Sequence, residues 1–148
     1  MDQTVSIHVA NALPKILLVE DFDDTRLMMK MWLVKIGYRV IEAETGEQAI
    51  ILAQSERPDL ILMDIMMPGM NGLDATQRIR QDGALSRTPI VAVSAYGAEK
   101  YRSLALEAGC NDYVSTPFEP ATLADLISAL LQVEESAHSN APATNLNH

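Results

Sequence analysis

The chain has 148 residues, a length typical of one globular domain, and its 48% hydrophobic and 21% charged residues are ordinary for a folded protein. No apolar run approaches the roughly 20 residues that a membrane span needs, so membrane insertion is not expected. The net charge of −9 disfavours direct binding to nucleic acid, and the single cysteine excludes an internal disulfide and fits a reducing cytoplasm.

The first half of the chain alternates short strands with helices. Strands are expected over 15–19 and 39–43, with a helix over 25–36 between them. Asp23 or Asp24 is the expected N-cap of that helix, and Gly37 its C-terminal stop. Thr45 then opens a second helix, with Gln48 three residues later forming a capping box, before Pro58 closes the region.

The second half repeats this alternation. The apolar run 60–63 reads as a strand buried on both faces that ends on Asp64 and is followed by a Pro-Gly break. A helix begins at Asn71-Gly72 and ends near Gly83. Two further strands, each followed by a helix, complete the pattern: strands over 90–93 and 113–115, and helices over 98–108 and 120–133.

Five strands alternating with five helices predict an α/β fold with a doubly wound parallel sheet. We expect one domain over residues 14–133. Residues 1–13 are polar and patternless, which predicts a flexible N-terminal arm, and the Ser, Asn and Ala residues of 134–148 predict a disordered C-terminal tail.

Acidic residues follow two of these strands. Because parallel strands end on the same edge of a sheet, Glu20, Asp21 and Asp64 should lie close together there, beside Ser94. Neighbouring carboxylates repel unless a cation or protons offset their charge, and Mg²⁺ prefers such oxygen ligands. A carboxylate beside Mg²⁺ can attack phosphorus to give an acyl phosphate, with the Ser94 hydroxyl bonded to a phosphoryl oxygen. The alternative is that these acids are separate loop caps.

Four ordered motifs resemble those of response-regulator receiver domains, the phosphoacceptor modules of two-component signalling. They are Ile-Leu-Leu-Val-Glu-Asp at 16–21, Pro-Asp-Leu-Ile-Leu-Met-Asp-Ile-Met-Met-Pro-Gly-Met-Asn-Gly at 58–72, Pro-Ile-Val-Ala-Val-Ser-Ala at 89–95 and Gly-Cys-Asn-Asp-Tyr-Val-Ser-Thr-Pro-Phe at 109–118. The resemblance covers about 14–133 and implies the flavodoxin-like strand order 2-1-3-4-5. It also implies a signalling domain rather than an enzyme, phosphorylated by a histidine kinase or a histidine phosphotransfer protein. No room remains after residue 133 for an output domain, so a stand-alone receiver is expected to signal through a downstream protein or a phosphorelay.

The resemblance also implies roles for individual residues. Asp64 corresponds to the phosphoacceptor. Glu20 and Asp21 correspond to the acidic pair that binds Mg²⁺, with Asp21 favoured as the direct ligand, and the backbone carbonyl of Met66 corresponds to a further ligand.

The switch residues of the family are matched only in part. Ser94 resembles the switch hydroxyl, and Tyr113 resembles the aromatic residue that rotates to report phosphorylation on the outer face. Thr116, however, stands where the family carries a Lys that reaches the phosphoryl group. A short neutral side chain cannot replace that charge-assisted contact, so we expect weaker coupling between Asp64 and the switch. Thr116 also leaves open an alternative function, a degenerate receiver-like module that binds partners without phosphorylation.

Met66 bears on the enzymatic alternative. Phosphate-hydrolysing enzymes of the haloacid-dehalogenase type place a second Asp two residues after the nucleophile, where this chain has Met66. Met66 and Tyr96 would flank the route to the phosphorus, and neither positions water well. These two residues predict at most slow self-dephosphorylation.

The helix over 25–36 has two apolar faces at about 100° per residue. One predicted face packs on the sheet and contains Met28, Met29, Trp32, Leu33 and Ile36. The other contains Leu27, Met31 and Val34, on a side that should be polar in a surface helix. Scattered exposed apolar residues are common, but this spacing favours a docking face for a helical phosphodonor.

Overall fold

A five-stranded parallel sheet forms the centre of the molecule. The computed structural model describes residues 13–95 and 99–146, with the backbone alone described for 134–146. The strands are β1 (Lys15–Val19), β2 (Arg39–Ala43), β3 (Leu60–Asp64), β4 (Ile90–Ser94) and β5 (Asp112–Ser115). They pair in parallel in the order β2-β1-β3-β4-β5, which confirms the expected fold class.

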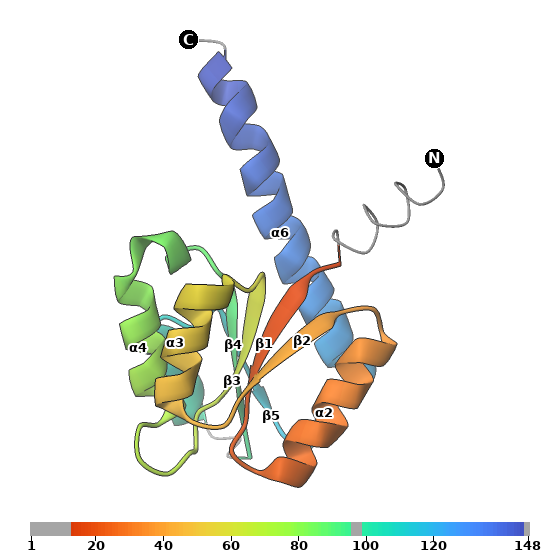
Figure 1. The fold of residues 1–148 in the computed structure, drawn as a ribbon, viewed down its shortest axis with the longest axis vertical. Helices are drawn as coiled ribbons and strands as arrows, with labels where there is room; N and C mark the ends of the chain where they lie inside the picture. Colours follow the sequence, from red (N-terminus) through yellow and green to blue (C-terminus); the bar gives the residue numbers. More distant parts are fainter. Residues whose placement is uncertain (1–12, 96–98, 147–148) are drawn as a thin grey trace.

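Helices cover both faces of this sheet. They are α2 (Asp23–Lys35), α3 (Gly46–Glu56), α4 (Gly72–Gln81), α5 (Glu99–Ala108) and α6 (Pro120–Leu146), with a short 3₁₀ turn, η1 (Gly83–Leu85), after α4. In Figure 1, α2 and α6 lie on one side of the sheet, and α3 and α4 lie on the other. Buried residues of α3, α4 and α5 form one core with the sheet, and those of α2 and α6 form the second.

The strand β3 shows why its sequence is apolar without alternation. Ile61 and Met63 belong to the core under α3, α4 and α5, whereas Leu60 and Leu62 belong to the core under α2 and α6. All four are at most 1% exposed. A strand covered on both faces needs apolar residues at every position, and the first half-buried side chain of β3 is Asp64, at its carboxyl end.

The N-cap prediction is confirmed for α3 and wrong for α2, whereas the predicted C-terminal stop of α2 is confirmed, since Gly37 follows the C-cap with a φ of 109°. The Thr45 hydroxyl accepts a hydrogen bond from the Gln48 N–H at 3.1 Å, and the Gln48 amide oxygen accepts one from the Glu44 N–H at 2.8 Å. The N-cap position of α2 is Phe22, and its side chain makes no capping bond. Asp23 and Asp24 lie inside the first turn, where their charges favour the helix through its dipole.

The inward face of α2 also differs from the prediction. Leu33 is buried, and Met29 and Trp32 pack with it, but Met28 is 70% exposed and Ile36 is 40% exposed. Met28 lies about 140° around the helix from Leu33, too far to reach the sheet. Ile36 lies at the C-cap, beyond the last helical turn. Met28 therefore belongs with the outer face.

The last helix is longer than predicted. In place of an end near Val133 and a disordered tail from residue 134, the helical backbone continues to Leu146 and projects beyond the sheet (Figure 1). Extending an existing helix costs little, and Ala and Glu residues past 133 favour it. Residues 1–12, which make up most of the predicted N-terminal arm, and residues 147–148 lie outside the described part. Across the described ranges, no helix is both long and apolar enough to cross a membrane.

Candidate functional site

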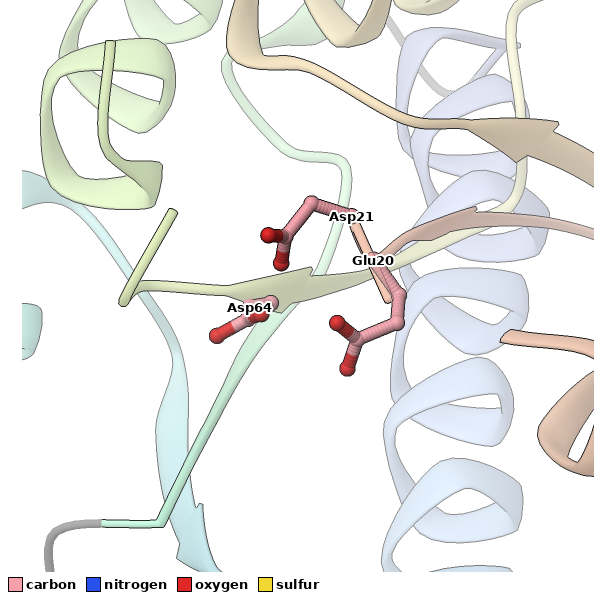
Figure 2. Close-up of side chains that lie close together, drawn as sticks. All are labelled: Glu20, Asp21 and Asp64. Carbon is pink, nitrogen blue, oxygen red and sulfur yellow. The ribbon is translucent and has the colours of Figure 1, made fainter. Parts of the chain in front are cut away.

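Three carboxylates meet at the carboxyl edge of the sheet. Glu20 and Asp21 follow β1 directly, and Asp64 ends the neighbouring strand β3. One oxygen from each of the three side chains lies within 4.8 Å of the other two. Figure 2 shows these side chains gathered where β3 ends. The structure thus brings together the acidic residues that the sequence places at separate strand ends.

The backbone around Asp64 fixes the position of its carboxylate. Its Oδ1 accepts a hydrogen bond from the Met66 N–H at 2.9 Å. The turn after β3 returns so closely that a Cβ atom on Gly72 would collide with the Asp64 carbonyl oxygen and with the Cα of Ile65, 2.7 Å away. Only glycine fits there, at the start of α4, so Gly72 permits the tight turn that presents Asp64.

Hydrogen bonds hold both the backbone and the side chain of Glu20 in place. Its N–H donates to the Ala43 carbonyl at 3.0 Å, and its side-chain Oε2 accepts from the Phe22 N–H at 3.0 Å. The Glu20 carbonyl accepts a third bond, from Nη1 of Arg26 at 2.9 Å. The loop between β1 and α2 is therefore anchored to the end of β2 and to the first turns of α2.

The grouping of acids changes their protonation. Burial raises the pKa of Asp64 to about 8, the negative charge of Glu20 adds to this rise, and the hydrogen bond from Met66 opposes it. The pKa of Glu20 is also raised, chiefly by burial. Asp64 is thus largely protonated at neutral pH when nothing else offsets the charge of its neighbours.

This donor set fits Mg²⁺. Three hard carboxylate oxygens within 4.8 Å of one another, at a solvent-accessible strand edge, provide the ligand type and the negative charge that the ion prefers. A divalent cation would also remove the repulsion that raises the pKa of Asp64.

The two predicted switch residues, Ser94 and Tyr113, lie on β4 and β5. Ser94 ends β4 and is 2% exposed, and the Thr116 N–H donates to its carbonyl at 2.7 Å. Thr116 therefore occupies the strand edge next to Ser94, without any charge. Tyr113 points inward at 6% exposure, and its hydroxyl has no hydrogen-bond partner in the described part of the chain.

The other predicted site residues are exposed or lie outside the description. Met66 follows Asp64 by two residues and is 44% exposed, whereas Tyr96 lies outside the described residues. On α2, Leu27, Met31 and Val34 are each more than half exposed, so they are free for contact with a partner.

The positions or contacts of three residues near the site were not predicted correctly from the sequence. Met28 was assigned to the wrong face of its helix because a helical wheel alone does not fix which residue is central. Gly72 was predicted only as a helix start, because its close approach to the backbone of Asp64 and Ile65 depends on how the turn after β3 folds back. For Arg26 the sequence shows only the i,i+3 pair with Asp23, because its contacts with Glu42 and Glu44 depend on tertiary structure.

Comparison with known proteins gives consistent matches. Residues 16–128 match the model of the response regulator receiver domain family. Protein PilH of Pseudomonas aeruginosa is 35% identical over 117 residues, which cover 79% of this chain and 97% of PilH. The transcriptional regulatory protein ResD of Bacillus subtilis is 37% identical over 135 residues, covering 89% of this chain and 55% of ResD. The chain thus spans about half the length of ResD and of similar transcriptional regulators.

Solved structures agree in fold. The receiver domain of a sensor histidine kinase from Pseudomonas aeruginosa PAO1, which has a magnesium ion coordinated in its active site cleft, is 36% identical with a TM-score of 0.77, covering 82% of this chain and 99% of that one. Chemotaxis protein CheY4 of Vibrio cholerae is 28% identical with a TM-score of 0.76, covering 80% of this chain and 99% of that one.

Proposed function

Because the chain belongs to the response regulator receiver family, we propose that it accepts a phosphoryl group on Asp64 from a histidine kinase or a histidine phosphotransfer protein. The observation that carries this proposal is the grouping of Glu20, Asp21 and Asp64 within 4.8 Å. Mg²⁺ is the proposed cofactor, with Asp21, Glu20, Asp64 and the Met66 carbonyl as its ligands.

The proposed chemistry is a displacement at phosphorus. A carboxylate oxygen of Asp64 forms the new P–O bond while the P–N bond to the donor histidine breaks, and the leaving imidazole takes up a proton from solvent. Held by these ligands, Mg²⁺ would offset negative charge on the phosphoryl oxygens. The hydrogen bond from Met66 holds Asp64 in a fixed orientation for the attack.

Ser94 and Tyr113 form the proposed switch. From β4, the strand next to β3, the Ser94 hydroxyl would donate a hydrogen bond to a phosphoryl oxygen on Asp64. Tyr113 would change position in response. The orphaned Tyr113 hydroxyl supports such a change, since a buried polar group without a partner costs about 1–3 kcal/mol and gains water on turning outward. Thr116 offers no charge to strengthen this coupling.

The proposed donor interface is the outer face of α2, formed by Leu27, Met31 and Val34 and enlarged by Met28, which is 70% exposed. These side chains form an apolar stripe on a helix whose N-terminus adjoins the acidic loop, so a helical donor bound there has its histidine near Asp64. Stand-alone action, a downstream protein target and a cytoplasmic location remain predictions from the sequence.

Acetyl phosphate with Mg²⁺ tests the proposal against the alternative of a phosphorylation-independent interaction module, which Thr116 favours. Intact-mass spectrometry should show the mass of one added phosphoryl group, removable by hydroxylamine and missing in Asp64→Asn. An unmodified wild-type protein that still binds its partners would support the alternative.

Slow self-dephosphorylation is the expected fate of the acyl phosphate. Met66 is 44% exposed beside Asp64, and its thioether neither donates a hydrogen bond nor orients an attacking water. Replacing it with a side chain that can orient water, Met66→Glu or Met66→Asn, should shorten the half-life of the phosphorylated protein in a chase followed by intact mass. Equal half-lives in Met66→Ala, Met66→Asn and wild type would contradict this role.

A further inference from the structure

Arg26 makes contacts that reach beyond its own helix. Its side chain is 13% exposed, although it lies on the second turn of α2, whose neighbouring residues 27 and 28 face solvent. Its Nη1 donates to the Glu20 carbonyl at 2.9 Å, and its Nη2 contacts Asp23 at 2.7 Å. Its Nε lies 3.4 Å from Glu42, and its Nη2 lies 3.5 Å from Glu44.

These partners belong to the three chain segments that meet at the acidic edge. Glu20 follows β1, Asp23 begins α2, and Glu42 and Glu44 flank the end of β2. The planar guanidinium can serve several acceptors at fixed angles, which a lysine ammonium cannot do. Arg26 therefore adds a second link between the backbone of residue 20 and β2, beside the bond from the Glu20 N–H to the Ala43 carbonyl, and so helps to hold the loop that carries Glu20 and Asp21.

We propose that Arg26 is a positioning residue for the divalent-cation site, holding the Glu20–Asp21 loop in its ligating shape through the Glu20 carbonyl. This inference rests on the proposed function, because it takes Glu20 and Asp21 as the residues that bind Mg²⁺. Arg26 is not itself a ligand, but its loss should weaken metal binding.

If Arg26 acted only through its charge, its removal should tighten Mg²⁺ binding rather than weaken it. The positive charge of Arg26, whose Nη1 bonds the backbone of the metal-site residue Glu20, repels Mg²⁺, so removing that charge should tighten metal binding. If Arg26 instead orders the ligands, its removal should weaken metal binding, since the residues that orient metal ligands typically contribute about tenfold or more to affinity. The sign of the change therefore distinguishes the two roles.

Lys30 provides a matched control. It lies on the same helix, carries the same charge and contacts the same carboxylate, with its Nζ 3.0 Å from Glu42, but no contact joins it to residue 20. Lys30→Met thus removes a positive charge without releasing the loop, and Arg26→Met removes a positive charge and releases it.

Isothermal titration calorimetry with Mg²⁺ on the full chain provides the measurement. We expect about tenfold or greater weakening in Arg26→Met, a smaller loss in Arg26→Lys, and unchanged or slightly tighter binding in Lys30→Met. Binding by Arg26→Met as tight as that of wild type, or tighter, would overturn the inference.

Folding and the underlying proposal are controlled separately. Far-UV circular dichroism identifies the variants that fold at the titration temperature. If Arg26→Met does not fold, Arg26→Lys is titrated in its place. Binding of Mg²⁺ by Arg26→Lys with the affinity of wild type would then count against the inference. A wild-type protein that binds no Mg²⁺ contradicts the proposed function itself. Normal binding by wild type together with unweakened binding by the Arg26 variants contradicts the inference alone.

Discussion

Asp64 lies half-buried between Glu20 and the backbone of Met66, and burial raises its pKa from an ordinary 3.8 to about 8. Without a cation, the folded protein therefore holds a proton on Asp64 over a pH range in which the unfolded chain has lost it. The folded state binds more protons between about pH 4 and pH 8, so this group makes the free energy of unfolding fall as the pH rises through that window.

Asp64→Asn should remove this pH dependence. In EDTA at pH 8, we expect the variant to be more stable than wild type by on the order of 1–2 kcal/mol, after allowance for the partial exposure of the carboxylate. The two proteins should converge near pH 4, where both carry a neutral group at position 64. Urea unfolding at several pH values measures the difference.

Asp24 supplies the control for this experiment, because it is an exposed acid on α2 outside the cluster. Asp24→Asn should leave the pH profile parallel to that of wild type. Adding Mg²⁺ at pH 8 should raise the free energy of unfolding of wild type and should not raise that of Asp64→Asn. If the profiles of Asp64→Asn and wild type run parallel from pH 4 to pH 8, the burial and repulsion ascribed to Asp64 are wrong.

Thr116 adjoins Ser94 through a backbone hydrogen bond of 2.7 Å but brings no charge to the site. A charge-assisted hydrogen bond contributes about 1.5–3 kcal/mol, so Thr116→Lys should favour the switched state of the phosphorylated protein by about tenfold or more. Difference absorption or NMR signals of Tyr113, measured with and without acetyl phosphate, report this change.

Thr116→Met serves as the comparison, since it adds a long side chain without a charge. It should behave like wild type in this measurement. Thr116→Lys with the same phosphotransfer rate and the same Tyr113 signals as wild type would show that position 116 does not limit the switch.

At the scale of single residues, the sequence predicted the members of the site better than their surroundings. Glu20, Asp21 and Asp64 could be found because strand ends in a parallel sheet share one edge. The raised pKa of Asp64 could not be predicted, because it depends on burial and on the distance to Glu20. The contacts of Arg26 depend in the same way on tertiary structure.

Among the helices, α2 links the site to the proposed donor. Met31 is 63% exposed at the centre of its apolar outer face. A negative charge placed there, Met31→Glu, should reduce transfer from a phosphohistidine donor protein by about tenfold, because burying an unpaired charge costs more than the apolar contact contributed. Transfer from acetyl phosphate should not change, since a small donor needs no docking face.

Ile51 provides a control of equal exposure. It is also 63% exposed but lies on α3, across the sheet from α2. Ile51→Glu should leave both donors unaffected. Equal losses with the protein donor and with acetyl phosphate in Met31→Glu would indicate damage to the site rather than to a docking face.

Helix faces and helix ends were the elements that sequence patterns predicted least well. Periodicity separated the two apolar stripes of α2 but put Met28 on the wrong one, because the orientation of a helix is set by the sheet beneath it. The end of α6 was misplaced because the polar composition past Val133 indicates solvent exposure, which a projecting helix satisfies as well as a coil does.

For the whole molecule, the parallel sheet and its covering by helices on both faces followed from sequence patterns, whereas the strand order followed from the family resemblance. Continuous apolar runs at 16–19, 60–63 and 90–93 required a sheet covered on both faces, and the alternation with helices required parallel strands. These constraints are global, so a shift of a few residues in one helix does not affect them. The same architecture places Glu20, Asp21, Asp64 and Ser94 at one edge of the sheet.

We infer that this edge accepts a phosphoryl group at Asp64 and at no other acid. Borohydride reduces an aspartyl phosphate to homoserine, so peptide mass spectrometry of protein treated with acetyl phosphate, Mg²⁺ and then borohydride identifies the modified residue. We predict homoserine at position 64, dependent on Mg²⁺, and unmodified Glu20 and Asp21. Reduction products at position 20 or 21, or at none of the three, would show that Asp64 is not the phosphoacceptor.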